Sequence, residues 1–303
     1  MTTDVRLISV SNVTYVQKDN KKVRSTGGSI GAASVGLTLP VIISPATNLA
    51  FNKFKKIANV SDDKVEILHR AAEEALVNAN LHSKDIKINY VPEILKPTPE
   101  DKLYSAINPV LATRLGNNAY AVPKDGKFFN FQTLSLENIE KGVYIPEKKL
   151  AISPFHELGH QMNYHFSKIG KCLQYMRGVS MILPLVIMLY GAFSQKSEPD
   201  EDGNLSKIGK VNNFVRNHAG LLSFLAFTPI LLEEGMASIK GQKLANKVLS
   251  ADMAKLVKKG NIMAYLTYAI SGIAGGLASW AAVKVKDRAI EKKKQKIMNQ
   301  IIA

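Results

Sequence analysis

Four long stretches of the 303-residue sequence carry almost no charge, and they limit the folds that are open to the chain. A helix that crosses a bilayer needs about 20 mostly apolar residues. The stretches cover residues 27–51, 178–194, 219–232 and 262–283. We therefore expect an integral membrane protein, with the fourth stretch as the best span by length. Pro40 and Pro45 interrupt the first stretch, so spanning, re-entrant insertion and a peripheral or soluble role all stay open for it.

The positive charge of the chain indicates an anionic partner. The formal net charge is +15, which favours either nucleic acid or an anionic membrane surface. The basic clusters flank the apolar stretches, as at residues 53–56 and 284–296. The sequence contains no basic patch interleaved with aromatic residues, no zinc-finger spacing and no RNA-binding signature. We expect a lipid bilayer as partner, and no nucleic acid.

The single cysteine and the N-terminal residues limit the cellular compartment. Cys172 has no second cysteine to pair with, which fits a reducing compartment. We expect its side chain to be a small buried apolar group. Residues 1–24 are polar and basic without an apolar core, so a cleaved secretory signal is not expected.

The segments between the apolar stretches show distinct local patterns. Residues 61–81 predict an amphipathic helix with Ser61 as its N-cap. The apolar positions of that helix are Val65, Leu68, Ala72, Leu76 and Ala79. Prolines and glycines break residues 86–152 into strands, turns and one or two short helices. We expect strands at residues 118–122 and 143–145, and a third short apolar stretch at 150–152 leads into the next motif. A polar loop is expected at 195–217 and a basic amphipathic helix at 245–256.

The sequence His156-Glu157-Leu-Gly-His160 matches the pattern H-E-x-x-H. Histidines at i and i+4 lie on one face of a helix, so both imidazoles can bind one Zn²⁺ ion. Glu157 then stands beside the first ligand and can accept a proton from zinc-bound water as general base. Ser153 and Pro154 predict a helix start, and Gly170 predicts its end. Gly159 weakens a helix unless another backbone must approach closely.

A third zinc ligand must come from farther along the chain. Asn163 and Phe166 occupy the glycine and third-histidine positions of the longer metzincin motif, and no acidic residue lies between His160 and Glu198. If residues 178–194 and 219–232 both cross the membrane, the chain returns at Glu233 and Glu234. We predict Glu234 as the ligand, because Glu234, Ala237, Ser238 and Gly241 share one helical face whose small residues allow close packing. Glu233 stays open as the alternative ligand; it points about 100° away, toward solvent or a basic partner.

The motif Phe-His-Glu-Leu-Gly-His, followed after an apolar hairpin by Glu-x-x-Ala-Ser, resembles the gluzincin membrane peptidases. It is similar to the YugP-type neutral zinc metallopeptidases, and more distantly to the HtpX and CAAX prenyl protease group. The resemblance covers roughly residues 117–244 and implies Glu234 as third ligand. It also implies that Asn118, Ala119, Tyr120 and Ala121 form an edge strand that binds extended substrate. Ser238 departs from the HtpX group, which has Asp at this position.

These observations predict a mainly α fold with a small α+β portion. We expect a zincin-like core with an H-E-x-x-H helix and a transmembrane helical hairpin. The expected segments are an N-terminal segment with membrane insertion (1–58), a catalytic α+β part (59–177), the hairpin (178–244), and a basic helix, apolar helix and basic tail (245–303). Tyr164, His165, Arg216 and His218 are candidate oxyanion donors, and the sequence assigns this role to none of them.

The predicted function is that of a membrane-bound zinc endopeptidase acting on protein or peptide substrates. Basic residues between the apolar stretches place the active site on the cytoplasmic side of the plasma (inner) membrane by the positive-inside rule. The basic tail conflicts with that orientation unless residues 262–283 are re-entrant. Two alternatives stay open: a non-catalytic membrane scaffold with a vestigial zinc site, and a site-2-type intramembrane protease. Polar residues around the motif argue against the second.

Overall fold

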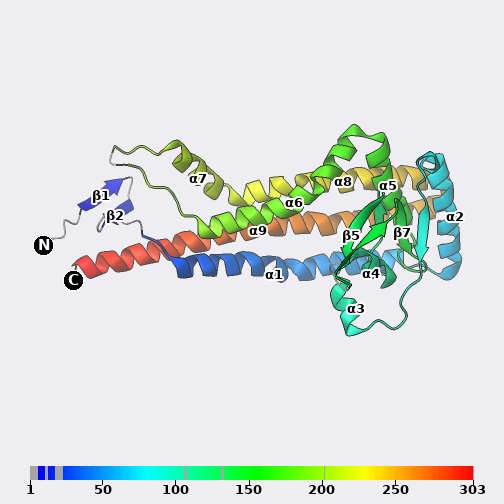
Figure 1. Ribbon diagram of the computed structural model, residues 1–303, viewed down its shortest axis with the longest axis horizontal. Helices are drawn as coiled ribbons and strands as arrows, with labels where there is room; N and C mark the ends of the chain where they lie inside the picture. The colour runs from blue at the N-terminus through cyan, green and yellow to red at the C-terminus, as the bar shows by residue number, and fades with distance from the viewer. Residues whose placement is uncertain are drawn as a thin grey trace. The chain divides into compact units, whose positions relative to one another are not determined.

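The computed structural model describes residues 6–10, 13–17, 23–105, 108–130, 133–200 and 202–302. The chain is mainly helical with a small portion of β-sheet, which confirms the expected fold class at that level (Figure 1). Of the segment predicted over residues 1–58, positions 1–5, 11–12 and 18–22 lie outside the described residues.

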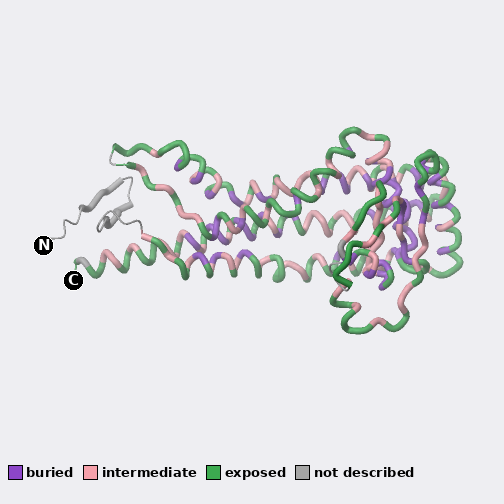
Figure 2. The backbone as a smooth tube through the Cα atoms, in the orientation of Figure 1, coloured by how far each residue is buried: buried purple, intermediate pink, exposed green. Residues whose placement is uncertain are grey.

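Four helices are long and apolar enough to cross a membrane, which supports the expectation of a membrane protein. They are α1 (Thr26–Ala58), α6 (Lys168–Phe193), α8 (Ala219–Val248) and α9 (Ala251–Ile302). Helix α1 runs unbroken through Pro40 and Pro45. Most of its residues in the apolar stretch are exposed or half-buried, as expected for a helix surrounded by lipid (Figure 2).

The chain forms two compact units, each assembled from separate parts of the sequence. The helical unit consists of Met1–Pro45, Gly178–Thr228 and Ile270–Ala303, and the mixed unit of Ala46–Arg177 and Pro229–Ala269. In the helical unit, β1 (Arg6–Val10) and β2 (Val13–Gln17) form an antiparallel pair.

The mixed unit contains a three-stranded sheet in the order β3-β7-β4. The central strand β7 (Gly142–Pro146) pairs in parallel with β3 (Ile88–Val91) and antiparallel with β4 (Tyr120–Val122). The predicted strands at residues 118–122 and 143–145 are therefore confirmed. A separate hairpin joins β5 (Gly126–Asn130) to β6 (Ser135–Ile139). The short helices are α3 (Pro99–Tyr104), α4 (Pro109–Arg114) and the 3₁₀ turn η1 (His82–Lys84).

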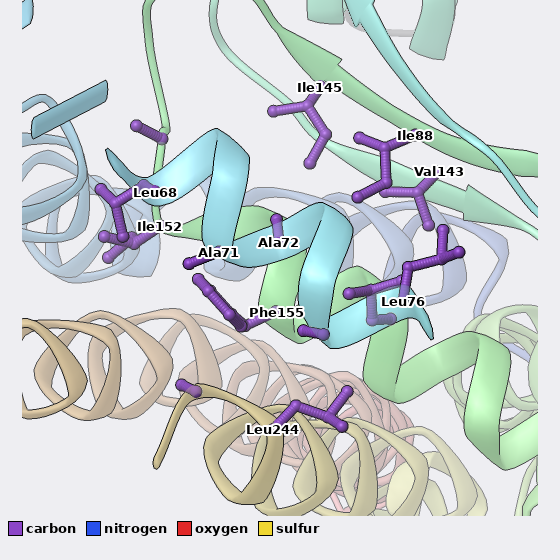
Figure 3. Close-up of a cluster of buried hydrophobic side chains, with 14 of the residues drawn as sticks. Leu68, Ala71, Ala72, Leu76, Ile88, Val143, Ile145, Ile152, Phe155 and Leu244 are labelled. Carbon is purple, nitrogen blue, oxygen red and sulfur yellow. The ribbon is translucent and has the colours of Figure 1, made fainter. Parts of the chain in front are cut away.

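Helix α2 (Asp62–Asn78) packs its apolar face into the core of the mixed unit. Leu68, Ala72 and Leu76 are buried there, at the spacing that predicted this helix. They belong to one cluster with Ile145 of the sheet and Phe155 of the next long helix (Figure 3). The prediction of the helix is confirmed, with Ser61 at its N-cap position. This core holds the sheet and the H-E-x-x-H helix together.

The entry to helix α5 (Ser153–Phe166) differs from the predicted one. The short apolar stretch at residues 150–152 forms a turn, in which Leu150 has a left-handed backbone with φ of 54°. Its N–H donates to Oδ1 of Asn59 at 3.0 Å, so this turn is tied to the residues that follow α1. Ile152, not Ser153, is the N-cap. The helix ends at Phe166 rather than at Gly170, which belongs to α6.

Three other predictions are corrected. The expected loop at 195–217 contains helix α7 (Lys207–Asn217), whose N-cap Ser206 accepts a hydrogen bond from the N–H of Gly209 at 3.0 Å. The expected helix at 245–256 is interrupted between α8 and α9. Cys172 is exposed, because it lies on an outward face of α6.

Candidate metal centre

Helix α5 presents two histidines one turn apart. Nε2 of His156 lies 3.1 Å from Nε2 of His160, and the two rings meet edge to face. Each residue is only 8% exposed, so the pair is shielded from bulk water. The spacing of the motif therefore does bring both imidazoles to one point.

Helix α8 crosses α5 at two glycines. A Cβ added to Gly159 would overlap the carbonyl of Ala237, and a Cβ added to Gly241 would overlap the carbonyl of Phe155. Only glycine leaves room for two backbones at this distance. This contact explains Gly159, and it brings the acidic pair of α8 beside the histidines.

Glu234 completes a triangle of donor atoms with the two imidazoles. Its Oε2 lies 3.1 Å from Nε2 of His156 and 3.6 Å from Nε2 of His160. Zinc–ligand bonds of 2.0–2.1 Å in tetrahedral geometry put ligand atoms about 3.3–3.4 Å apart. The three observed distances bracket that value, so the donor set fits a tetrahedral ion. These buried groups could hold a metal ion.

The outer ring nitrogens of both histidines are also engaged. Nδ1 of His160 lies 2.8 Å from Oε1 of Glu233, and Nδ1 of His156 lies 3.2 Å from Oγ of Ser238. Such contacts fix the ring orientation and direct Nε2 toward a metal. Glu233 is fully buried, so the predicted solvent-facing orientation is wrong, and a basic partner is what the side chain contacts.

Glu233 belongs to a buried polar network. It accepts hydrogen bonds from Asn163 at 3.0 Å and Gln174 at 2.9 Å. Arg177 reaches Oε2 of Glu233 at 3.0 Å and Oε1 of Glu234 at 2.5 Å. Buried carboxylates need such partners, because an unpaired buried charge is strongly destabilising. The network therefore holds both carboxylates in place.

Glu157 is buried beside this group, with a carboxylate oxygen within 4.8 Å of the ligand nitrogens of both histidines. Burial raises the pKa of Glu157, and the imidazoles of His160 and His156 oppose that rise. For His160, burial alone would lower the pKa, but the carboxylates of Glu234 and Glu233 outweigh it and raise the pKa well above its ordinary value. A carboxyl with a raised pKa beside a metal position suits proton transfer.

A cavity of about 460 Å³ opens over the histidines. All its lining residues belong to the mixed unit. One wall holds His156, Glu157 and His160, and another holds Asn118, Ala119, Tyr120 and Ala121, the four residues predicted to bind substrate. Strand β4 is at an edge of the sheet, and its second edge pairs with no strand of the described chain. The cavity therefore contains both histidines and residues of the edge strand β4.

Gln161 fastens the histidine helix to the sheet. Its Nε2 donates to the carbonyls of Val122 in β4 and Gly142 in β7, at 2.9 and 2.8 Å. One side chain thereby sets the position of the edge strand relative to the two imidazoles.

Sequence reasoning missed several residues of the site. Gln174, Arg177 and Tyr268 line the cavity, with NH2 of Arg177 3.4 Å from the hydroxyl of Tyr268. For Arg177 the sequence did contain a signal. An arginine at the start of an apolar stretch needs an acidic partner, which could have linked it to the buried acids. Tyr268 carried no such signal.

The four candidate oxyanion donors from the sequence lie elsewhere. Tyr164 contacts the hydroxyl of Tyr175 at 3.2 Å, and neither Tyr164 nor His165 lines the cavity among the described residues. Arg216 and His218 belong to the helical unit. The chemistry of the centre therefore rests on two imidazoles, three carboxyl groups and the side chains of Arg177 and Tyr268. No family model, no curated protein and no solved structure matches the chain.

Proposed function

We propose that the protein is a membrane-bound zinc-dependent endopeptidase. One observation carries the proposal: Nε2 of His156, Nε2 of His160 and Oε2 of Glu234 converge within 3.6 Å of one another beside the buried carboxyl of Glu157. Catalytic zinc commonly has three protein ligands of this type and one position for water. The resemblance to YugP-type peptidases points to the same reaction.

The donor set favours zinc over other metals. Two imidazole nitrogens and one carboxylate disfavour Mg²⁺ and Ca²⁺, which prefer oxygen ligands. Iron(II) oxygenases also use two histidines and one carboxylate. Glu157, next in sequence to the first histidine, supports hydrolysis, because this is the position of the general base in H-E-x-x-H peptidases.

Each residue then has a defined task. A zinc ion held by His156, His160 and Glu234 would lower the pKa of a bound water and would polarise the scissile carbonyl. Glu157 accepts the proton of that water and delivers it to the leaving amine. Glu233 and Ser238 hold the two imidazoles by their Nδ1 atoms. Tyr268 is the proposed donor to the developing oxyanion, because it lines the cavity, carries a hydroxyl group and is not a predicted ligand.

Strand β4 is the proposed substrate platform. An extended peptide can add to the free edge of a sheet through backbone hydrogen bonds. Residues 118–121 line the cavity that contains Glu157, so a peptide on this edge passes the catalytic carboxyl. The apolar wall formed by Phe51 and Phe54 favours an apolar substrate side chain.

We propose that the site acts at the cytoplasmic face of the plasma (inner) membrane. Basic residues are frequent in segments 51–177 and 235–259 of the sequence, which supports this side by the positive-inside rule. The tail from Lys284 to Lys296 is equally basic and lies in the continuous helix α9. Reporter fusions at Asp202 and Lys294 test the orientation, and an extracytoplasmic site would overturn it.

The alternatives make different predictions. A scaffold with a vestigial site would bind zinc without hydrolysis, and the intact Glu157 argues against it. A site-2-type protease would need its motif within an apolar span, whereas α5 carries Gln161, Asn163 and His165.

The decisive experiment measures metal and hydrolysis on the full chain purified in detergent. We expect one zinc per chain by mass spectrometry and zinc-dependent cleavage of fluorescently labelled casein. Glu157→Gln should keep zinc and lose cleavage, while His160→Ala should lose both. Glu74→Gln, an exposed acid on α2, is the control. Cleavage by Glu157→Gln at the wild-type rate would refute the role of Glu157 as general base. Iron in place of zinc would refute the assignment to zinc-dependent peptidases.

Tyr268→Phe tests the proposed oxyanion donor separately. Removing one such donor commonly costs about 100- to 1000-fold in kcat. We expect that loss with KM and zinc content unchanged. A purely structural tyrosine would instead alter zinc content or thermal stability, and an unchanged kcat would exclude the role.

A further inference from the structure

Helix α7 in the helical unit exposes apolar side chains and buries polar ones. An amphipathic helix on a water-soluble protein does the opposite. Its outward side chains include Ile208, Val211 and Phe214, which are 84%, 63% and 55% exposed. Its buried positions include Asn212 and Arg216. A helix facing water normally buries its apolar side and exposes its polar one. The exposed apolar side chains of α7 therefore suit contact with an apolar medium.

Polar contacts hold α7 in this orientation. Nδ2 of Asn212 donates to the carbonyl of Gln195 at 2.8 Å, and its Oδ1 accepts from the hydroxyl of Tyr190 at 2.6 Å. The guanidinium of Arg216 donates to the carbonyl of Ser194 at 2.6 Å and pairs with Asp287 at 2.5 Å. Turning the apolar side inward would break these bonds and leave buried groups unpaired. The outward apolar face is thus a fixed feature of the fold.

The helices on either side of α7 in the sequence also expose apolar side chains. Phe193 at the end of α6 is 61% exposed, and Leu221 near the start of α8 is 57% exposed. Both helices are candidate membrane spans. A short helix between the ends of two spans lies at the level where acyl chains meet headgroups. Lipid therefore accounts for all three exposed surfaces together.

Charge at this end of the helical unit favours an anionic lipid. Lys207 and Lys210 of α7 are exposed, and a long lysine side chain can extend from an apolar surface to the headgroups. The basic part of α9 lies at the same end, because Arg216 pairs with Asp287 and Lys294 pairs with Glu198. Clusters of lysine next to a membrane surface attract anionic headgroups.

We propose that α7 is an interfacial anchor that inserts Ile208, Val211 and Phe214 among the acyl chains of an anionic leaflet. Its lysines bind the phosphate groups of the lipids. This inference is independent of the metal centre, since every residue that carries it belongs to the helical unit. It would hold for a protein without peptidase activity.

The test places an environment-sensitive fluorophore on the full chain in vesicles. Cys172 is exposed and is first replaced by serine. Single cysteines then replace Ile208, Phe214 or, as control, Asn204 in the polar loop, which is also exposed. Proteoliposomes contain phosphatidylcholine with or without 30 mol% phosphatidylglycerol. Quenching by nitroxide lipids is compared with quenching by iodide present on both sides.

We expect lipid quenching at least threefold stronger at positions 208 and 214 than at 204, and the reverse order for iodide. Phosphatidylglycerol should increase the protection from iodide, and Lys207→Gln with Lys210→Gln should remove that increase. Equal iodide quenching at all three positions would overturn the proposal. Protection from both quenchers would also overturn it, because a second protein surface would then cover α7. Val211→Cys replaces any labelled variant that loses helix content.

Discussion

Replacing Gly159 by alanine tests whether the crossing of α5 and α8 assembles the metal centre. The added Cβ would overlap the carbonyl oxygen and carbon of Ala237. These are backbone atoms, so no side-chain rotation can relieve the contact. Ordinary van der Waals contact begins near 3.4 Å, and reaching it requires the two helices to move apart by about 1 Å.

The energetic effect on folding should be small, and the effect on metal binding large. Overpacking costs about 1–3 kcal/mol, and replacing a helical glycine by alanine returns up to about 1 kcal/mol. The fold therefore survives. Zinc bond lengths tolerate deviations of only about 0.2 Å. A shift of about 1 Å between Glu234 on α8 and the histidines on α5 thus removes the third ligand. We expect zinc affinity to fall at least 100-fold, or about 2.7 kcal/mol.

The assay is competition for zinc between the purified protein and a chelating dye, with helix content followed by circular dichroism. Gly178→Ala is the matched control, because Gly178 is also helical and an added Cβ there meets no atom within 4 Å. The control should bind zinc as the wild type does. If Gly159→Ala kept full helix content and an affinity within threefold of the wild type, the centre would not depend on this crossing.

Three further changes test other parts of the mixed unit. Glu233→Gln should weaken zinc binding about 10- to 100-fold in the same dye assay, because the carboxylate that orients His160 is lost. Gln161→Leu should lower the free energy of unfolding by about 1–3 kcal/mol in denaturant titrations, because two buried carbonyls lose their donor. His69→Gln should reduce the loss of stability on acidification. Burial lowers the pKa of His69, so below pH 6.5 the unfolded chain takes up a proton that the folded chain does not.

For each of these three substitutions, one outcome would contradict the prediction. Zinc affinity that is equal in Glu233→Gln and the exposed control Glu74→Gln would remove the orienting role of Glu233. An unfolding midpoint for Gln161→Leu at the wild-type value would mean that the carbonyls find other donors. For His69, the measurement is the thermal unfolding midpoint between pH 7 and pH 5. If the midpoints of variant and wild type fell in parallel, His69 would not be the group that causes the loss of stability on acidification.

Periodic and motif-based features of the fold were predictable from the sequence. The apolar residues of α2 recur at helical spacing, so the sequence alone shows which face of the helix is buried. The small-residue face of α8 was predictable for the same reason, and Gly241 and Ala237 do contact α5. Features set by one or two long-range bonds were not predictable. The turn at Leu150 depends on Asn59, which is 91 residues away.

Helix α7 was missed for a different physical reason. Its inward face is polar and its outward face apolar, so a reading that assigns polar residues to water predicts a loop. Only the partners of Asn212 and Arg216, on α6, the α6–α7 connection and α9, reveal that this polar face is satisfied inside the protein. For Glu233 the sequence left solvent and a basic partner open, and the choice depends on partners that lie on α5 and α6.

The charge of the centre favours the binding of a cation. Glu157, Glu233 and Glu234 are all buried, and Arg177 is the fixed positive charge that contacts two of them. Without a metal, the excess negative charge can be balanced only by protons. The pKa of His160 is accordingly raised well above its ordinary value, with the two α8 carboxylates overcoming the effect of burial. A dication bound by Nε2 of His156 and His160 would replace the proton on His160. It would also neutralise more negative charge than that proton does. Three buried acids around two histidines are costly without a cation, since unpaired buried charges destabilise a fold. The same electrostatic imbalance that would destabilise the empty centre would favour the binding of a metal ion under the proposed function.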